Sequence, residues 1–171
     1  MLRHDVQMTE GGADLLALLR ELDDPQWLEW PATYDRNAVA ARFGELVARL
    51  ESDFGVPCVA EQDTQDSSEY GRATVPAEAT VCGTRIVVCV SKFGSLPLVC
   101  AENPGAFLGT QDAQDEGELD AAALASVERA LVELGFSVVP EELVESDYGG
   151  PSRAHLYGQR PTWWDRFFGT F

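Results

Sequence analysis

The chain has 171 residues, which is enough for one domain with a sizeable core, and its apolar fraction of 45% argues against wholesale disorder. Its 29 acidic and 12 basic residues give a formal net charge of −17, and such a surface repels phosphate backbones and anionic lipid. We therefore expect neither a nucleic-acid nor a membrane partner. The charge either attracts a basic protein or serves solubility alone.

The opening residues, MLRHDVQMTEGG, lack the apolar core of a signal peptide. No apolar run approaches the roughly 20 residues that span a bilayer, so we expect a soluble, cytoplasmic protein. The four cysteines have no CxxC spacing, and three of them lie in or beside predicted strands. This pattern favours small buried apolar residues over a metal site or a disulfide.

Two helices are predicted in the first third of the chain. Leucines at close spacing predict a helix over residues 12–22, which ends before Pro25. A second helix follows Asp35 as a potential N-cap, repeats apolar residues with a period of 3.6, and stops at Gly55. Between them, Trp27 and Trp30 either cover one end of the core or form a binding patch.

The middle of the chain predicts an antiparallel sheet. Strand candidates cover residues 56–63 and 70–75, and residues 86–90 and 96–100 form a central hairpin. Gly94 supplies the turn, and Pro97 places the return strand near an edge or at a strand start. Residues 111–120 are expected to be an acidic loop, and a third helix spans about 120–134 before Gly135.

The last third holds a possible short strand over 136–139 and a third acidic cluster over 140–147, with Glu142 and Glu145. An aromatic tail, residues 160–171, ends the chain. Thr162 and Asp165 have the spacing of a capping box, and two aromatic pairs at i,i+4 follow. The tail either folds back onto its own domain, forms a homodimer contact, or docks a partner. The whole order predicts one α+β domain over residues 1–171, an antiparallel meander with about three helices packed on it.

No motif for catalysis or cofactor binding is present. The two histidines, His4 and His155, give little material for a triad or a metal site, and no P-loop, GxSxG or GxGxxG occurs. We therefore predict no catalytic residue, cofactor or metal. The alternative is a small enzyme with a divalent cation held by Asp63, Asp66 and Glu69, although their spacing is not that of an EF-hand.

The acids suggest a physical function instead. Three acidic loops are predicted: one around Asp63 and Asp66, one with Asp112, Asp115 and Glu116, and one with Glu142 and Glu145. If they share a face, they would draw a basic partner, and exposed aromatic residues would hold it. The candidate partner-binding residues are Asp63, Asp66, Tyr70, Asp112, Asp115, Glu116, Tyr148, Trp163 and Trp164. The competing interpretation is that these loops point in different directions and form no common surface.

Three short segments carry a pattern of core and turn residues: Trp30…Tyr34…Val39-x2-Arg42-Phe43-x2-Leu46, Gln65-Asp66-x-Ser68-x-Tyr70-Gly71, and Ser91-x-Phe93-Gly94-x-Leu96. Over about residues 30–139 this pattern resembles small cytoplasmic immunity-type proteins of bacterial polymorphic toxin systems. The resemblance implies a catalytically inert protein that occludes a cognate toxin, which is often a basic nuclease. It carries over no binding residue. A self-associating structural or regulatory domain that uses residues 163–171 is the remaining alternative.

Overall fold

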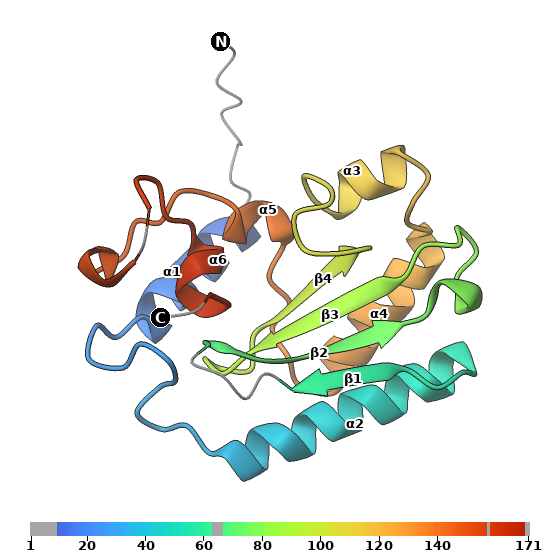
Figure 1. Cartoon of the computed structure of the whole chain (residues 1–171), viewed down its shortest axis with the longest axis horizontal. Helices are drawn as coiled ribbons and strands as arrows, with labels where there is room; N and C mark the ends of the chain where they lie inside the picture. The colour runs from blue at the N-terminus through green and yellow to red at the C-terminus, as the bar shows by residue number, and fades with distance from the viewer. Residues whose placement is uncertain (1–9, 63–66, 157, 170–171) are drawn as a thin grey trace.

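The computed structural model describes residues 10–62, 67–156 and 158–169. Its centre is a four-stranded antiparallel meander in the order β1-β2-β3-β4, formed by β1 (Val59–Gln62), β2 (Glu69–Val75), β3 (Ile86–Ser91) and β4 (Pro97–Ala101) (Figure 1). β3 is buried along its whole length, as its unbroken apolar run predicts. Pro97 begins β4, an edge strand, where its missing N–H costs no ladder bond.

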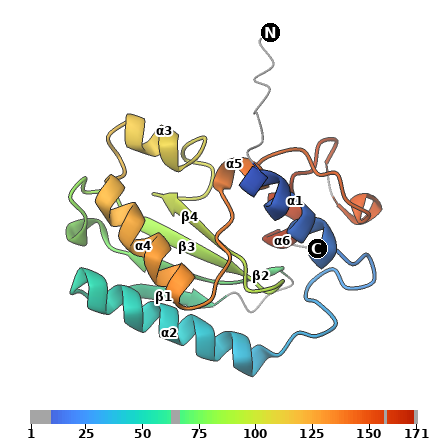
Figure 2. The same cartoon turned by 180° about the vertical axis from the view of Figure 1, so that it is seen from behind.

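Two helices cover one face of the sheet. α2 (Arg36–Phe54) and α4 (Ala121–Glu133) lie across it side by side, as Figure 2 shows from behind. They bury Phe43, Leu46 and Leu131 against the face of β2 and β3 that carries Ala73 and Val88. The sequence places these apolar residues correctly because a helix with one buried face repeats them every three or four positions.

The second core lies on the other face, around the turn between β3 and β4. α1 (Glu10–Leu22), α5 (Glu141–Val144) and α6 (Trp163–Phe167) gather there (Figure 1). Leu19 of α1 and Trp163 and Phe167 of α6 pack with Cys89 and Leu98 of the sheet. The first and last described helices, far apart in the sequence, therefore share one core.

The predicted α+β class and meander are confirmed, as are the three long helices. Asp35 caps α2 by accepting bonds from the N–H groups of Asn37 and Ala38, and Gly55 ends it in the left-handed conformation. Gly94 has a φ of 58° in the hairpin turn. Short 3-10 turns at Ala77–Ala79 and Arg153–His155 complete the described elements.

One element was predicted incorrectly, and one was left open. Residues 111–120 were expected to be a loop, but α3 (Thr110–Asp115) forms there because Ala113 is drawn into the first core. Residues 136–139 form no strand; they run extended beside β4, where the Val139 N–H donates to the Pro97 carbonyl at 3.0 Å. Within the described residues, no helix combines the length and apolarity needed to cross a membrane.

Candidate functional site

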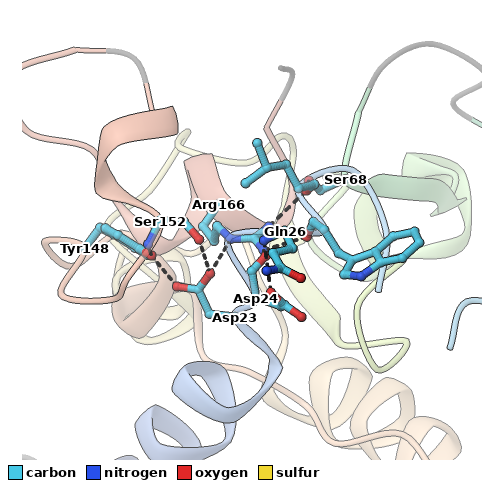
Figure 3. A network of polar contacts seen from close by, with 9 residues as sticks. Asp23, Asp24, Gln26, Ser68, Tyr148, Ser152 and Arg166 are labelled. Carbon is cyan, nitrogen blue, oxygen red and sulfur yellow. Dashed lines mark hydrogen bonds and ion pairs between the residues drawn. The ribbon is translucent and has the colours of Figure 1, made fainter. Parts of the chain in front are cut away.

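A buried ion pair connects the two ends of the chain. The Arg166 Nε donates to the Asp23 Oδ1 at 2.6 Å, and both side chains are 0% exposed. Asp23 also accepts bonds from the Tyr148 hydroxyl and, at 2.6 Å, from the Ser152 Oγ (Figure 3). We call Asp23, Tyr148, Ser152 and Arg166 the Arg166 cluster. A buried carboxylate is tolerable here because a full positive charge and two hydroxyl donors compensate it.

The remaining donors of Arg166 hold a loop. Its Nη1 donates to the Leu28 carbonyl at 3.0 Å, and its Nη2 donates to the carbonyls of Trp27 at 3.0 Å and Asp24 at 3.2 Å. The guanidinium carbon also lies 4.5 Å from the centroid of the Phe93 ring. We call residues 24–30 the tryptophan loop. Its path is fixed because three of its peptide groups bind one rigid, planar cation.

The tryptophan loop presents apolar surface to solvent. Trp27 and Trp30 are each 40% exposed, and residues 25–30 line a shallow hollow of about 310 Å³. Trp30 stacks on Tyr34 with ring centroids 6.1 Å apart, and the Lys92 Nζ lies 5.7 Å from the Trp30 ring centroid. Of the two uses that the sequence allows for these tryptophans, a binding patch is the one that this exposure favours.

Two of the three predicted acidic loops lie next to each other along one edge of the molecule, where the loop that leads into α3 passes beside α5 in both views (Figures 1 and 2). Gly109 packs so closely on Glu142 that a Cβ there would overlap the carboxylate. We call Asp112, Asp115, Glu116, Glu142 and Glu145 the acidic end. Beside them, Leu108 is 80% exposed, and its N–H donates to the Asp112 Oδ2 at 2.9 Å.

A buried carboxylate beside the acidic end also shapes the loop that carries Leu108. The Glu141 Oε1 accepts a bond from the Gly105 N–H at 2.9 Å. Burial raises the pKa of Glu141, and the neighbouring Glu145 and Glu142 carboxylates add to this increase. Burial and the nearby Asp165 raise the pKa of Glu145. Burial is the main cause of both shifts, and the nearby carboxylates contribute in the same direction.

Most of the aromatic residues that were predicted to contact a partner are buried. Tyr70 packs edge-on against Phe43 in the first core, Tyr148 belongs to the Arg166 cluster, and Trp163 is buried in the second core. Trp164 remains half-buried and stacks on Phe168 at 4.8 Å. The tail therefore folds back onto its own chain, and burial removes Tyr70, Tyr148 and Trp163 from any partner-contacting surface of this structure.

The alternative cation site of Asp63, Asp66 and Glu69 gains no support from Glu69, the one of these three residues that the structure describes. Asp63 and Asp66 lie outside the described residues, and the Glu69 carboxylate is bound by the Arg72 guanidinium. Among the residues that the structure describes, no group of three or more acidic, histidine or cysteine side chains is arranged to hold a metal ion. The Asp23 carboxylate accepts three hydrogen bonds within the Arg166 cluster, which indicates a structural role for this cluster.

The Arg166 cluster was not predicted from the sequence. Asp23 was given no role beyond the end of the first helix, and Arg166 was not singled out. The available signal was a lone arginine inside a strongly apolar segment, because an arginine there must find a buried partner. The partner itself lies 143 residues away and has no sequence signature.

Comparison with known proteins identifies no relative: no family model, no curated protein and no solved structure matches this chain.

Proposed function

We propose that this protein is a non-catalytic acidic binding protein that recognises a basic protein, and that it acts as an immunity-type protein by occluding a toxin. The observation that carries this proposal is the acidic end, whose residues lie on or directly after α3 and α5, next to the loop that carries the exposed Leu108; the Leu108 N–H donates to the Asp112 carboxylate, and Glu142 packs against Gly109. Acidic side chains around an apolar residue are a suitable contact for a basic surface, since charge steers the encounter and the apolar group adds affinity.

The distribution of charge along the chain supports the same proposal. No lysine or arginine occurs between Lys92 and Arg129, nor between Arg129 and Arg153. α3 and α5 come from these two stretches, so neither helix carries a base that would neutralise its acids. A negative potential that is not compensated locally raises the association rate with a basic partner about 10- to 1000-fold at low salt.

The first experiment identifies the partner and tests the surface. The chain is used as bait at low salt, and proteins are eluted in salt steps and identified by mass spectrometry. Affinity for the protein recovered is then compared for two variants that each remove four negative charges. One neutralises the acidic end: Asp115→Asn, Glu116→Gln, Glu142→Gln and Glu145→Gln. The other neutralises exposed acids elsewhere: Glu21→Gln, Glu45→Gln, Glu61→Gln and Glu78→Gln.

The acidic-end variant is expected to bind about tenfold more weakly or worse, since several ion pairs of a few tenths of a kcal/mol each are lost. The charge-matched control should change affinity by no more than about threefold. Equal losses in both variants would show that the charge acts generically. Binding that is indifferent to ionic strength would refute the electrostatic basis of the proposal.

Leu108 provides a separate test of the apolar contact. Leu108→Ala should weaken binding by at least about fivefold if Leu108 enters the interface, while Val81→Ala, which truncates another highly exposed residue, should not. A partner whose own enzymatic activity is seen only when it is free of this chain would support neutralisation.

A further inference from the structure

The tryptophan loop exposes its side chains because its backbone faces inward. The carbonyl groups of residues 24, 27 and 28 all point at the Arg166 guanidinium (Figure 3). A loop that wraps three carbonyls around one buried cation must direct most of its side chains away from that cation. Trp27 and Trp30 are therefore exposed by the geometry of the loop, although their size would favour burial.

The loop is held in this form before any partner arrives. The Asp24 Oδ1 accepts a bond from the Gln26 N–H at 2.9 Å, and the Asp24 carbonyl accepts one from the Trp27 N–H at 3.0 Å. The Ser68 Oγ adds a bond to the Leu28 carbonyl at 3.1 Å. Fixing the loop in advance lowers the entropy lost on binding, which is the usual advantage of a preorganised site.

Around the tryptophan loop, the basic side chains are buried and the acidic side chains of the loop itself lie closer to solvent. Residues 21–35 contain five acidic residues and no basic one. The two cations that reach the loop from elsewhere are buried, since Arg166 is 0% and Lys92 8% exposed, and Lys92 donates to the Ser67 carbonyl at 2.6 Å. Asp24, by contrast, is exposed and Glu29 is half-buried in the lining of the hollow. The outer layer therefore consists of indole rings and carboxylates.

Indole faces beside carboxylates recognise cations. An ammonium or guanidinium over a tryptophan ring is attracted by the ring quadrupole, and arginine makes this contact most often. The chain already uses one such contact internally, between Lys92 and Trp30. Among the described residues, no cation lies over the ring of Trp27. At about 310 Å³ the hollow is at the small end of ligand sites, which suits one side chain.

We infer that the tryptophan loop binds an arginine side chain of a basic protein partner, with the guanidinium on the Trp27 ring and paired with Glu29. The inference rests on the proposed function only for the basic character of the partner. It adds a second contact surface, built by α1, the loop and the C-terminal segment, and separate from the acidic end of α3 and α5.

The test uses a peptide, so it does not require the partner to be known. Full-length protein labelled with ¹⁵N at tryptophan gives one indole N–H signal each for Trp27, Trp30, Trp163 and Trp164. The signals are assigned with Trp27→Phe and Trp30→Phe. Acetylated hexaarginine is then titrated at low salt, with hexalysine as a charge-matched probe and hexaproline as a neutral probe for aromatic grooves.

Hexaarginine should shift the signals of Trp27 and Trp30 and leave that of the buried Trp163 unchanged. Trp27→Ala and Glu29→Gln should each weaken its binding by about five- to tenfold, the loss expected for one cation–π contact or one partly desolvated ion pair. Hexalysine should bind more weakly than hexaarginine. Val81→Ala is the matched control, because it truncates an exposed apolar side chain outside both the loop and the acidic end.

Two outcomes would overturn the inference: hexaarginine binding that is unchanged in Trp27→Ala and Trp30→Ala, or indole shifts produced by hexaproline instead. The variant with a neutralised acidic end separates this inference from the proposed function. Retained indole shifts in that variant support the loop as an independent site. Loss of them there, with the loop intact, would assign the binding to the acidic end and refute the inference.

Discussion

Arg166 shows how a single side chain can organise a surface that it never reaches. It binds the Asp23 carboxylate and the carbonyls of residues 24, 27 and 28, and its guanidinium lies against the Phe93 ring. No buried side-chain nitrogen or oxygen atom of the described residues lacks a hydrogen-bond partner. The cost of burying the two charges is thus offset by complete pairing, and removal of either partner should be severe.

Asp23→Asn tests this pairing. It keeps the shape of the side chain but leaves the Arg166 charge buried without its counter-charge, so the free energy of unfolding should fall by about 3–5 kcal/mol. Urea unfolding followed by far-UV circular dichroism measures this. Asp14→Asn, at an exposed position of the same helix, should change it by no more than about 0.5 kcal/mol. Similar small effects in both variants would contradict the account.

Tyr148 should make the stability of the folded protein depend on pH in alkaline solution. Burial and the Asp23 carboxylate raise the pKa of Tyr148 from 10.0 to about 12. The folded state therefore disfavours the phenolate, and the associated stability is fully present below pH 10 and lost as the pH rises to about 12. The loss approaches about 1.4 kcal/mol per pH unit within that window.

Tyr148→Phe should lose this component of the pH dependence while also lowering stability at neutral pH by about 1–3 kcal/mol, because Asp23 loses a donor. Urea titrations of both proteins at several pH values isolate the difference. Other alkaline groups titrate equally in both proteins and cancel, so parallel pH profiles for the two would count against the assigned role of Tyr148.

At the scale of elements, α6 shows how local sequence and tertiary packing cooperate. The Thr162 Oγ1 accepts from the Asp165 N–H, and the Asp165 carboxylate accepts from the Thr162 N–H at 2.7 Å, which completes the predicted capping box. The predicted i,i+4 pair of Trp163 and Phe167 is stacked with a centroid distance of 5.9 Å. Five residues are too few for an isolated helix, so burial must supply the rest.

Thr162→Ala removes the N-cap of α6 and should lower the free energy of unfolding by about 1 kcal/mol. Differential scanning calorimetry would show this as a decrease of about 2–4 °C in the melting temperature for a chain of this size. Ser137→Ala, which removes an exposed hydroxyl outside any helix, is the control. An unchanged melting temperature for Thr162→Ala would mean that packing alone holds α6.

The helix α3 illustrates the opposite case. Gly109 precedes it with no side-chain cap, and its six residues are polar except for Ala113. Nothing in this pattern distinguishes it from an acidic loop, so the sequence predicted the loop. The helix exists because Ala113 and the following Leu119 are buried in the first core, which is information carried by distant residues.

For the whole molecule, the net charge of −17 opposes compaction. Salt shortens the distance over which charges repel, from a Debye length of about 30 Å at 0.01 M to about 8 Å at 0.15 M. The melting temperature should therefore rise over this range, by about 2–4 °C for each kcal/mol of repulsion removed. The four-charge control variant defined above should show a smaller rise. A melting temperature that falls with added salt would contradict net repulsion.

The sequence by itself determined the fold class, the three long helices and their ends, the hairpin, and the capping box of the tail. Each of these follows from residues close together in the chain, because periodicity, caps and turns act over a few positions. The chain order of strands also sufficed for the meander, since consecutive antiparallel strands pair through short connections.

Only the tertiary structure decided which residues form surfaces. It buried Tyr148 and Trp163, exposed Trp27 and Trp30, and brought two acidic loops next to each other. The reason is physical: exposure depends on what packs against a residue, and here the partners come from the far end of the chain. Asp23 and Arg166 are 143 positions apart, and the bonds between them and the loop decide where its tryptophans point.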